Sequence, residues 1–166
     1  QNTAARFAQG DVTGAVNDVA GASGVVVGAA GSLPGDLHKL WRNSEPNTYH
    51  LEYGYSCMGY EIAGGLGAKL AAPGREVFVL VGDGSYLMMN SEIATSIALG
   101  LKLTIVVLDN RGFGCINRLQ AACGGEPFNN LLDDPGGTQG APVIAFAPHA
   151  RGLGGTGVAV TGIAAH

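Results

Sequence analysis

Charged side chains are scarce in this chain of 166 residues. They make up 13% of the sequence, roughly half of the share that is usual in soluble domains. Nine Lys and Arg stand against thirteen Asp and Glu, so the formal net charge is −4. No basic stretch offers the surface that displaces counterions from nucleic acid, so we expect no nucleic-acid partner. Because so little of the surface is charged, we expect another domain or subunit to cover part of it.

Long apolar runs and paired cysteines are also missing. The richest apolar run, 24–31, is interrupted by glycine and is too short to cross a bilayer, and the first residues show no signal-peptide pattern. The cysteines are Cys57, Cys115 and Cys123, which cannot all pair and form no C-x-x-C motif. Reduced thiols in a cytoplasmic protein without a membrane partner are the simplest interpretation.

Apolar runs and helical patterns alternate along the chain. The runs within 23–30, 76–81 and 103–108 are rich in β-branched and aliphatic residues and are predicted as strands buried on both faces. Helical spacing predicts helices over 11–20, 58–72, 88–99 and 143–153. Turn chemistry is found at 32–36, and the Gly, Asn, Asp and Pro content of 111–140 predicts a long loop. The alternation is typical of an α/β fold, a parallel sheet flanked by helices.

The first predicted helix has three valines at helical spacing. Val12, Val16 and Val19 would share one face of this helix. The last residues, 154–166, are rich in small side chains and predict no element.

Polar residues follow two neighbouring strands where each strand ends. Asp83 follows one predicted strand, and Asn110 follows the next strand, 27 positions later. Ligands of parallel sheets bind at this edge, and carboxylate and amide oxygens suit Mg²⁺. Glycines that let backbone N–H groups approach a phosphate stand on both sides: Gly82, Gly84, Gly112 and Gly114. Either motif alone is also typical of a turn, but the matched pair indicates a site for a magnesium diphosphate.

The motif GDGS, followed at this spacing by LDNRGFG, resembles the thiamine-diphosphate motif of the thiamine-diphosphate-dependent enzymes. The resemblance is to their diphosphate-binding (PP) domain, and it implies that residues 1–166 are such a domain, truncated at its C-terminus. It implies that Asp83 and Asn110 bind Mg²⁺ through their side chains and Gly112 through its backbone carbonyl. The implied cofactor contacts in these motifs are Gly82, Gly84, Ser85, Gly112, Phe113 and Gly114.

Two segments further upstream resemble the same family. EYGYSCMGY places Met58 where the family has a bulky apolar residue that supports the bent cofactor from beneath, although a Met at a helix start is also ordinary core. GSLPGDLHKLW places His38 where family members often direct a His toward the diphosphate, although loop histidines are equally often surface residues.

Four longer segments, AAGSLPGDLHKLW, EYGYSCMGYEIAGGLGAKLA, GDGSYLMMNSEI and NRGFGCINRLQ, are together similar to the trihydroxycyclohexanedione hydrolases of inositol catabolism. The resemblance implies cleavage of the C–C bond between adjacent carbonyls of a cyclic 1,2-diketone, which opens the ring to a deoxy-glucuronic acid. It implies a homodimer or homotetramer in which the pyrimidine-binding domain of a second subunit supplies the activating Glu. The chain would then be a fragment of a longer enzyme and inactive alone. A related lyase or carboligase acting on 2-keto acids, similar to acetolactate synthase, and a non-catalytic assembly module remain as alternatives.

Overall fold

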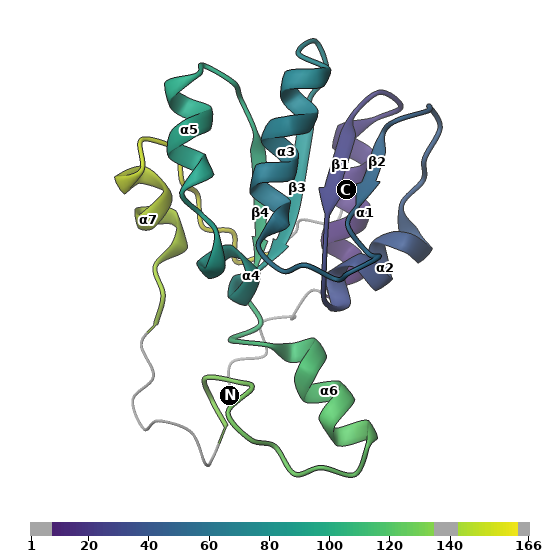
Figure 1. Cartoon of the computed structure of the whole chain (residues 1–166), viewed down its shortest axis with the longest axis vertical. Helices are drawn as coiled ribbons and strands as arrows, with labels where there is room; N and C mark the ends of the chain where they lie inside the picture. Colours follow the sequence, from purple (N-terminus) through teal and green to yellow (C-terminus); the bar gives the residue numbers. More distant parts are fainter. Residues whose placement is uncertain (1–7, 135–142, 163–166) are drawn as a thin grey trace.

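A four-stranded parallel sheet forms the centre of the molecule (Figure 1). The computed structural model describes residues 8–134 and 143–162. The strands are β1 (Val25–Gly28), β2 (Tyr49–Leu51), β3 (Val77–Gly82) and β4 (Thr104–Leu108), arranged in the order β2-β1-β3-β4. The parallel α/β fold predicted from the sequence is therefore confirmed.

Three of the four strands match the predicted apolar runs. The side chains of β1 and β3 are almost all buried, because each strand is hydrogen-bonded on both sides and covered on both faces. Those of β4 are only half-buried, since β4 forms one edge of the described sheet. The sequence did not predict β2, an edge strand of three residues with the exposed His50 at its centre, which is too short and too polar to show a pattern.

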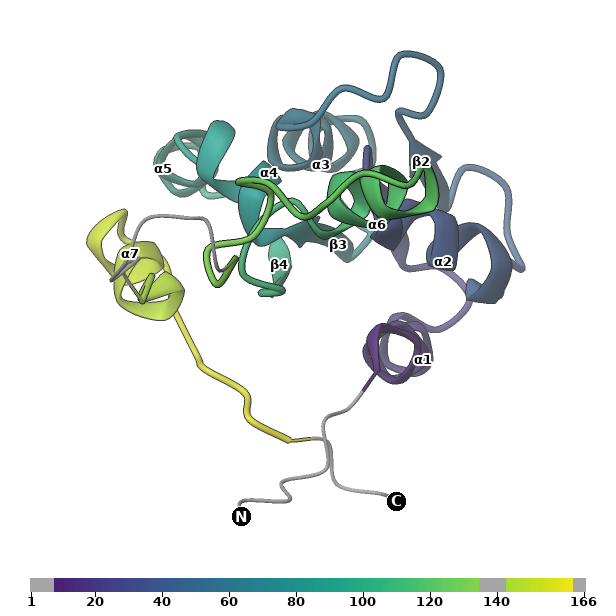
Figure 2. The same cartoon turned by 90° about the horizontal axis from the view of Figure 1, so that it is seen from below.

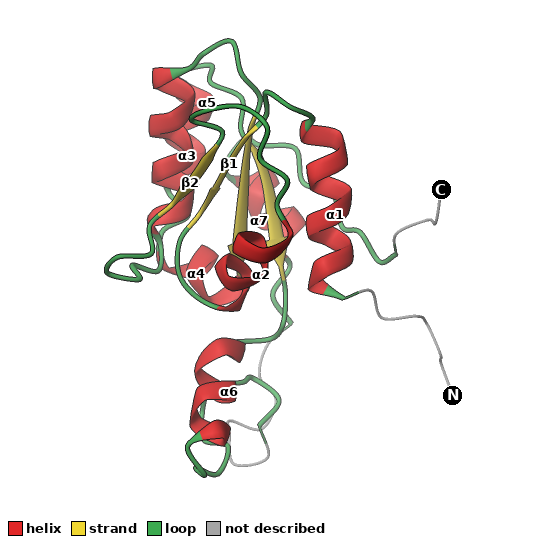
Figure 3. Cartoon of the chain, turned by 90° about the vertical axis from the view of Figure 1, so that its right-hand side faces the viewer, coloured by secondary structure: helices red, strands yellow, loops and turns green. Residues whose placement is uncertain are grey.

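Side chains that alternate along the strands form two hydrophobic layers. On one face, helices α1 (Gln9–Ala20) and α2 (Ser32–Leu40) cover the cluster that contains Phe78 and Leu80. On the other face, α3 (Tyr60–Ala71) and α5 (Glu92–Ala98) cover a cluster built on the valines of β1 and β3, to which α7 (Phe146–Gly152) adds Phe146. Figures 2 and 3 show α1 and α3 on opposite sides of the sheet. Each fully buried aliphatic side chain of these clusters contributes about 1.5–3 kcal/mol to the free energy of unfolding.

The buried face of α1 is not the face that the three valines share. Val19 is 77% exposed, whereas Thr13 and Asn17 are buried and Val16 packs against the core. The reason is a polar anchor, because the side-chain oxygen of Asn17 accepts a hydrogen bond of 2.8 Å from Nε of Arg42. This bond fixes the rotation of the helix and turns Val19 to solvent.

The predicted turn at 32–36 is wrong, because these residues form the first part of α2. Pro34 lies in the first helical turn, where its missing N–H would have no intrahelical partner. Gly31 precedes the helix with φ of 106°, a conformation that glycine adopts without strain.

The predicted helix over 88–99 is confirmed as the shorter α5, and a second helix, which the sequence did not predict, precedes it. α4 (Asp83–Met88) begins directly after β3, and α5 follows a short break. The break includes Asn90, whose side-chain amide donates to the carbonyl of Tyr86 and replaces a helical hydrogen bond.

The predicted long loop over 111–140 contains a helix, α6 (Gly114–Ala122), and its residues 135–140 lie outside the described part. α6 has no buried residue, and Ile116 and Leu119 are exposed. A helix without a buried face shows no amphipathic pattern, which is why the sequence did not predict it. The predicted C-terminal helix is confirmed as α7, and 154–162 contain neither helix nor strand.

The carboxyl ends of the strands meet at one edge of the molecule, which is where α4 begins. α6 lies beyond this edge and stands away from the sheet (Figures 1 and 3). None of the helices in the described ranges is long and apolar enough to cross a membrane.

Candidate functional site

Three oxygen-bearing groups converge at the carboxyl ends of β3 and β4. The two strands pair in register up to Gly82 and Leu108, so the residues that follow them are neighbours. The side-chain oxygen of Asn110 lies 3.1 Å from Oδ1 of Asp83 and 2.8 Å from the carbonyl oxygen of Gly112. The backbone N–H of Gly112 donates to Oδ2 of Asp83 at 2.7 Å. These three oxygens face one another with no donor between them, which gives a set of hard ligands suited to Mg²⁺; if the Asn110 amide were turned over, its nitrogen would instead donate to the other two oxygens.

Asp83 provides the single carboxylate of this set. Its side chain is only 2% exposed, and burial raises its pKa, with the Asp109 charge adding to the rise and the backbone N–H of Gly112 opposing it. The described residues contain no cluster of three His, Cys, Asp or Glu side chains that could hold a metal by themselves. One carboxylate combined with neutral oxygens is typical of Mg²⁺ sites that phosphate oxygens complete.

The backbone around Gly112 is held by a segment about twenty residues further along the chain. The N–H of Phe113 donates to the Asn130 carbonyl at 2.7 Å, and the N–H of Leu132 donates to the Arg111 carbonyl at 2.8 Å. Gly112 and Leu131 form an antiparallel bridge between these bonds. The position of the Gly112 carbonyl therefore depends on this second segment.

Two aspartates organise that second segment. Oδ2 of Asp134 accepts the backbone N–H groups of Asn130 and Leu131, each at 3.1 Å. Asp133 binds the guanidinium of Arg111 through both oxygens, at 2.8 and 3.2 Å, and this pairing lowers the pKa of the Asp133 carboxyl. The sequence did not mark either residue as part of the site.

We expect Asp133→Asn to weaken Mg²⁺ binding by a few-fold only. The pair with Arg111 lies at the surface, where such pairs are worth about 0–1 kcal/mol, while the backbone bonds to Asn130 and Leu132 remain. Titration of the chain with Mn²⁺, followed by electron paramagnetic resonance, measures the change. Glu76→Gln is the matched control, because it removes an exposed carboxylate that is paired with Lys102 outside the site. Equal affinities in the two variants would show that Asp133 has no influence on the site.

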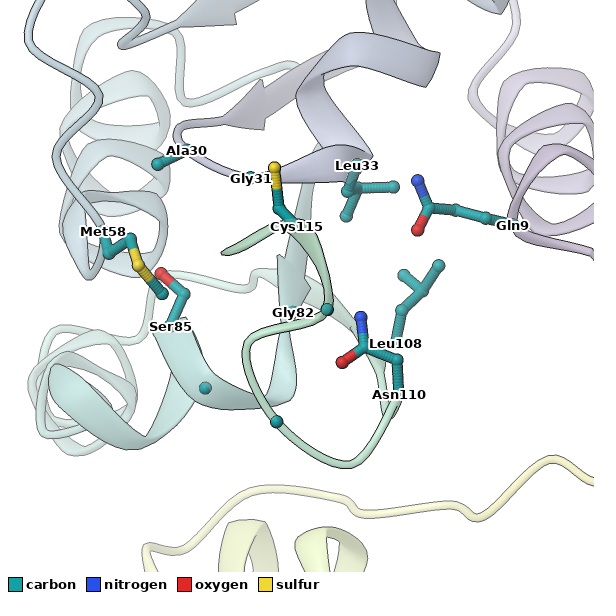
Figure 4. Close-up of a pocket in the computed structure, with 13 residues that line it drawn as sticks. Gln9, Ala30, Gly31, Leu33, Met58, Gly82, Ser85, Leu108, Asn110 and Cys115 are labelled. Carbon is teal, nitrogen blue, oxygen red and sulfur yellow. The ribbon is translucent and has the colours of Figure 1, made fainter. Parts of the chain in front are cut away.

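A pocket opens beside these ligands at the same edge (Figure 4). Seven of the predicted residues line it: Met58, Gly82, Gly84, Ser85, Asn110, Gly112 and Gly114. Six lining residues were not predicted: Gln9, Ala30, Gly31, Leu33, Leu108 and Cys115. Figure 4 shows Met58 and Ser85 on one side of the pocket and Gln9, Leu108 and Asn110 on the other.

Three predicted residues do not line the pocket. Asp83 is buried behind the pocket, and its carboxylate accepts the N–H of Gly112, which does line the pocket. The ring of Phe113 packs on Gly84, where a Cβ atom would lie 2.6 Å from Cε1 of the ring, so this contact requires glycine. His38 is exposed in the last turn of α2, and the structure does not bring it to the pocket. Its role toward a diphosphate stays a prediction.

Some of the pocket residues that were not predicted could have been recognised from their position in the sequence. Ala30 and Gly31 follow the carboxyl end of β1, the same position after a strand that identified Asp83 and Asn110. Cys115 belongs to the first turn of α6, which was predicted as loop. Nothing in the sequence pointed to Gln9, which α1 brings to the pocket from outside the sheet.

The chain resembles known proteins in sequence and in fold. Residues 29–165 match the thiamine pyrophosphate enzyme family, in its C-terminal TPP binding domain. A 3D-(3,5/4)-trihydroxycyclohexane-1,2-dione hydrolase of Bacillus cereus (strain AH820) is 47% identical over an alignment of 154 residues, and the match covers 90% of this chain and 24% of that protein. The corresponding protein of Bacillus thuringiensis (strain Al Hakam) is 50% identical over 120 residues, 72% of this chain and 19% of its own length.

One solved structure has the same fold. It is the thiamine diphosphate-dependent 4-hydroxybenzoylformate decarboxylase of Rhodococcus jostii RHA1, which superimposes with a TM-score of 0.81 at 22% identity. The match covers 96% of this chain and 29% of that one. The chain likewise spans about a quarter of the length of the curated relatives it matches.

Proposed function

Because this chain belongs to the thiamine pyrophosphate enzyme family, as its TPP-binding domain, we propose that it is the thiamine-diphosphate- and Mg²⁺-binding portion of a hydrolase that opens a cyclic 1,2-diketone. The observation that carries the metal assignment is the convergence of Asp83, Asn110 and Gly112 at the strand ends. The substrate class is a trihydroxycyclohexanedione, opened to a deoxy-glucuronic acid in inositol catabolism. Its support is the 47% identity to relatives that have this substrate in their names.

The residues at the pocket fit the magnesium diphosphate part of the cofactor. The buried Asp83 carboxylate offers the negative charge for the cation, and Asn110 and Gly112 offer neutral oxygens. The N-terminal ends of α2 and α6 border the pocket, and the partial positive charge of helix N-termini favours an anion there. When bound, thiamine diphosphate supplies an electron sink for cleavage of a C–C bond beside a carbonyl.

The remaining parts of the chain orient the cofactor. Met58 lines the pocket on the side of Ser85 and would support the cofactor rings. Phe113 packs on Gly84 and keeps the two glycine loops together. Residues of α4 and of the loop that follows β4 would hold the diphosphate.

The proposal includes a partner, the pyrimidine-binding domain of a second subunit in a homodimer or homotetramer. Exposed apolar side chains near the strand ends support it: Tyr55, Leu87, Met88, Met89, Ile116 and Leu119. Solvated apolar side chains in this number are typical of a surface that another chain covers. The proposal also places the protein in the cytoplasm, which is supported by three cysteines that form no disulfide.

Binding measurements test the cofactor assignment. We expect thiamine diphosphate to bind only together with a divalent cation, because the cation links the Asp83 carboxylate to the negatively charged diphosphate. Isothermal titration calorimetry with Mg²⁺, and again after its removal with EDTA, should show binding in the first case and none in the second. Binding of equal strength without a cation would contradict the metal site.

Substrate profiling of the complete enzyme tests the reaction. A cyclic 1,2-dione should be opened, whereas pyruvate should not be consumed. Turnover of pyruvate alone would favour the lyase or carboligase. A failure to bind thiamine diphosphate in the complete enzyme would favour the assembly module.

A further inference from the structure

Glu61 is a buried carboxylate that the proposed function does not use. It lies in the first turn of α3 and is 1% exposed. Its oxygens accept hydrogen bonds from the Ser85 hydroxyl, at 2.7 and 2.8 Å, and from the backbone N–H of Gly59, at 3.0 Å. A buried carboxylate is costly in free energy, and this one contacts a residue that lines the cofactor pocket.

The hydroxyl proton of Ser85 is already used in a hydrogen bond within the protein, so Ser85 cannot donate to a ligand. A hydroxyl has one proton and two acceptor positions. The proton is donated to Glu61, and one acceptor position is taken by the N–H of Gly59 at 2.7 Å. Only a lone pair then remains toward the pocket, and a lone pair repels a phosphate oxygen. Ionised Glu61 therefore prevents the Ser85 hydroxyl from binding a diphosphate.

Protonation of Glu61 reverses the direction of this hydrogen bond. The carboxylic acid would donate its proton to the oxygen of Ser85, which would then accept from both Glu61 and Gly59. The Ser85 proton becomes free to point into the pocket. The exchange needs no movement of heavy atoms, because the 2.7 Å distance suits either direction.

We propose that Glu61 takes up a proton when the diphosphate binds, and that this proton allows the Ser85 hydroxyl to donate to a phosphate oxygen. One proton passes from solvent to the Glu61 carboxylate, and no covalent bond forms or breaks elsewhere. The inference rests on the proposed function and concerns the same site. It makes Glu61 a positioning residue, since it acts on the ligand only through Ser85.

The surroundings of Glu61 favour its neutral form. Burial raises the pKa of Glu61, and the hydrogen bonds from Ser85 and from the backbone of Gly59 and Glu61 oppose the rise. The elements packed against α3 contribute three other titratable side chains, Asp83 and Tyr86 on α4 and Glu92 on α5. None of these three side chains can carry a positive charge, and no charged group of the described residues is among the causes of this shift.

Glu61→Gln imitates the protonated state and provides the test. A Gln amide can accept the N–H of Gly59 with its oxygen and donate to Ser85 with its nitrogen, in the places of Oε2 and Oε1. Affinity for thiamine diphosphate at saturating Mg²⁺ is measured by calorimetry between pH 5.5 and 8. We expect wild type to bind more weakly as the pH rises and Glu61→Gln to lose this dependence. At pH 8 the variant should bind about tenfold more tightly, the equivalent of one hydrogen bond to a charged group.

Proton counting gives a second readout that a merely structural role would not move. Calorimetry in buffers of different ionisation enthalpy should show that wild type takes up as much as one proton more than Glu61→Gln on binding. Ser85→Ala should bind with the weak affinity of wild type at pH 8 and show no proton uptake through Glu61. This second variant keeps the test decisive if circular dichroism shows that Glu61→Gln does not fold.

Glu76→Gln is the matched control, because Glu76 is an exposed glutamate at the opposite end of β3. It should bind as wild type does at every pH. Equal affinity and equal proton uptake in wild type and Glu61→Gln would overturn the inference and leave the proposed function intact. Absence of binding in all of these proteins would instead overturn the proposed function.

Discussion

Replacing Asp83 with Asn is expected to weaken Mg²⁺-dependent binding of thiamine diphosphate by at least about 100-fold. Loss of a residue that only supports a metal ligand costs about 10–100-fold, and Asp83 is the single carboxylate among the three converging groups. The substitution keeps the size of the side chain, and its oxygen can still accept the N–H of Gly112. The fold should therefore survive, and the loss should be confined to binding.

Calorimetry of the chain with the cofactor and Mg²⁺ measures this effect, and circular dichroism checks the fold. Asp109→Asn is the matched control. Asp109 is an exposed carboxylate close enough to raise the pKa of Asp83, but it binds the N–H of Arg111 and not the converging groups. It should change the affinity by a few-fold only. An affinity of Asp83→Asn within tenfold of wild type would remove Asp83 from the metal site.

The sheet and its functional edge were predictable from the sequence because burial leaves a simple pattern. Strands β1 and β3 lie between two helical layers, so nearly every position in them must be apolar. The residues after β3 and β4 have to end these strands and are polar, which made Asp83 and Asn110 visible. The register of β3 with β4 then brings the two residues together, as expected for parallel strands.

Features that depend on a single polar contact or on the conformation of one residue leave no such pattern, so the sequence does not predict them. Asn17 sets the rotation of α1 through Arg42, and no periodicity encodes such a bond. Pro34 was taken as a turn residue, although the first turn of a helix accepts it equally well. α6 buries nothing in this structure, so its sequence is under no requirement to be amphipathic.

The residues of the candidate site also differ in how far the sequence predicts them. Residues in the glycine-rich motifs were found because the motifs are local. The brace formed by residues 130–134 was not found, because its contacts to Arg111 and Phe113 join segments about twenty residues apart. Gln9 reaches the pocket from α1, and only the packing of α1 beside α2 brings it there.

Gly112 connects the loop that follows β4 to that brace, and its backbone conformation favours glycine over every other residue. Its φ is 136°, which strains every residue with a side chain. A Cβ atom at this position would lie 2.4 Å from the carbonyl oxygen of Asn130 and 3.0 Å from Cα of Leu131. Both neighbours are backbone atoms, so neither can move aside by a change of rotamer.

We therefore expect Gly112→Ala to separate the two segments and to abolish Mg²⁺-dependent binding of thiamine diphosphate. The strained φ alone costs about 1–3 kcal/mol, and opening the bridge to Leu131 displaces the Gly112 carbonyl from Asp83 and Asn110. Thermal unfolding should show a lower Tm, and amide hydrogen exchange should show lost protection at Phe113 and Leu132, whose N–H groups form the hydrogen bonds between the loop after β4 and the brace.

Gly67→Ala is the control, and its expected effect on stability has the opposite sign. Gly67 lies exposed within α3 with no atom near its Cβ position, so alanine there should stabilise the helix by about 0.5–1 kcal/mol and leave binding unchanged. Retained protection at Phe113 together with unchanged binding in Gly112→Ala would show that the loop does not need this backbone geometry.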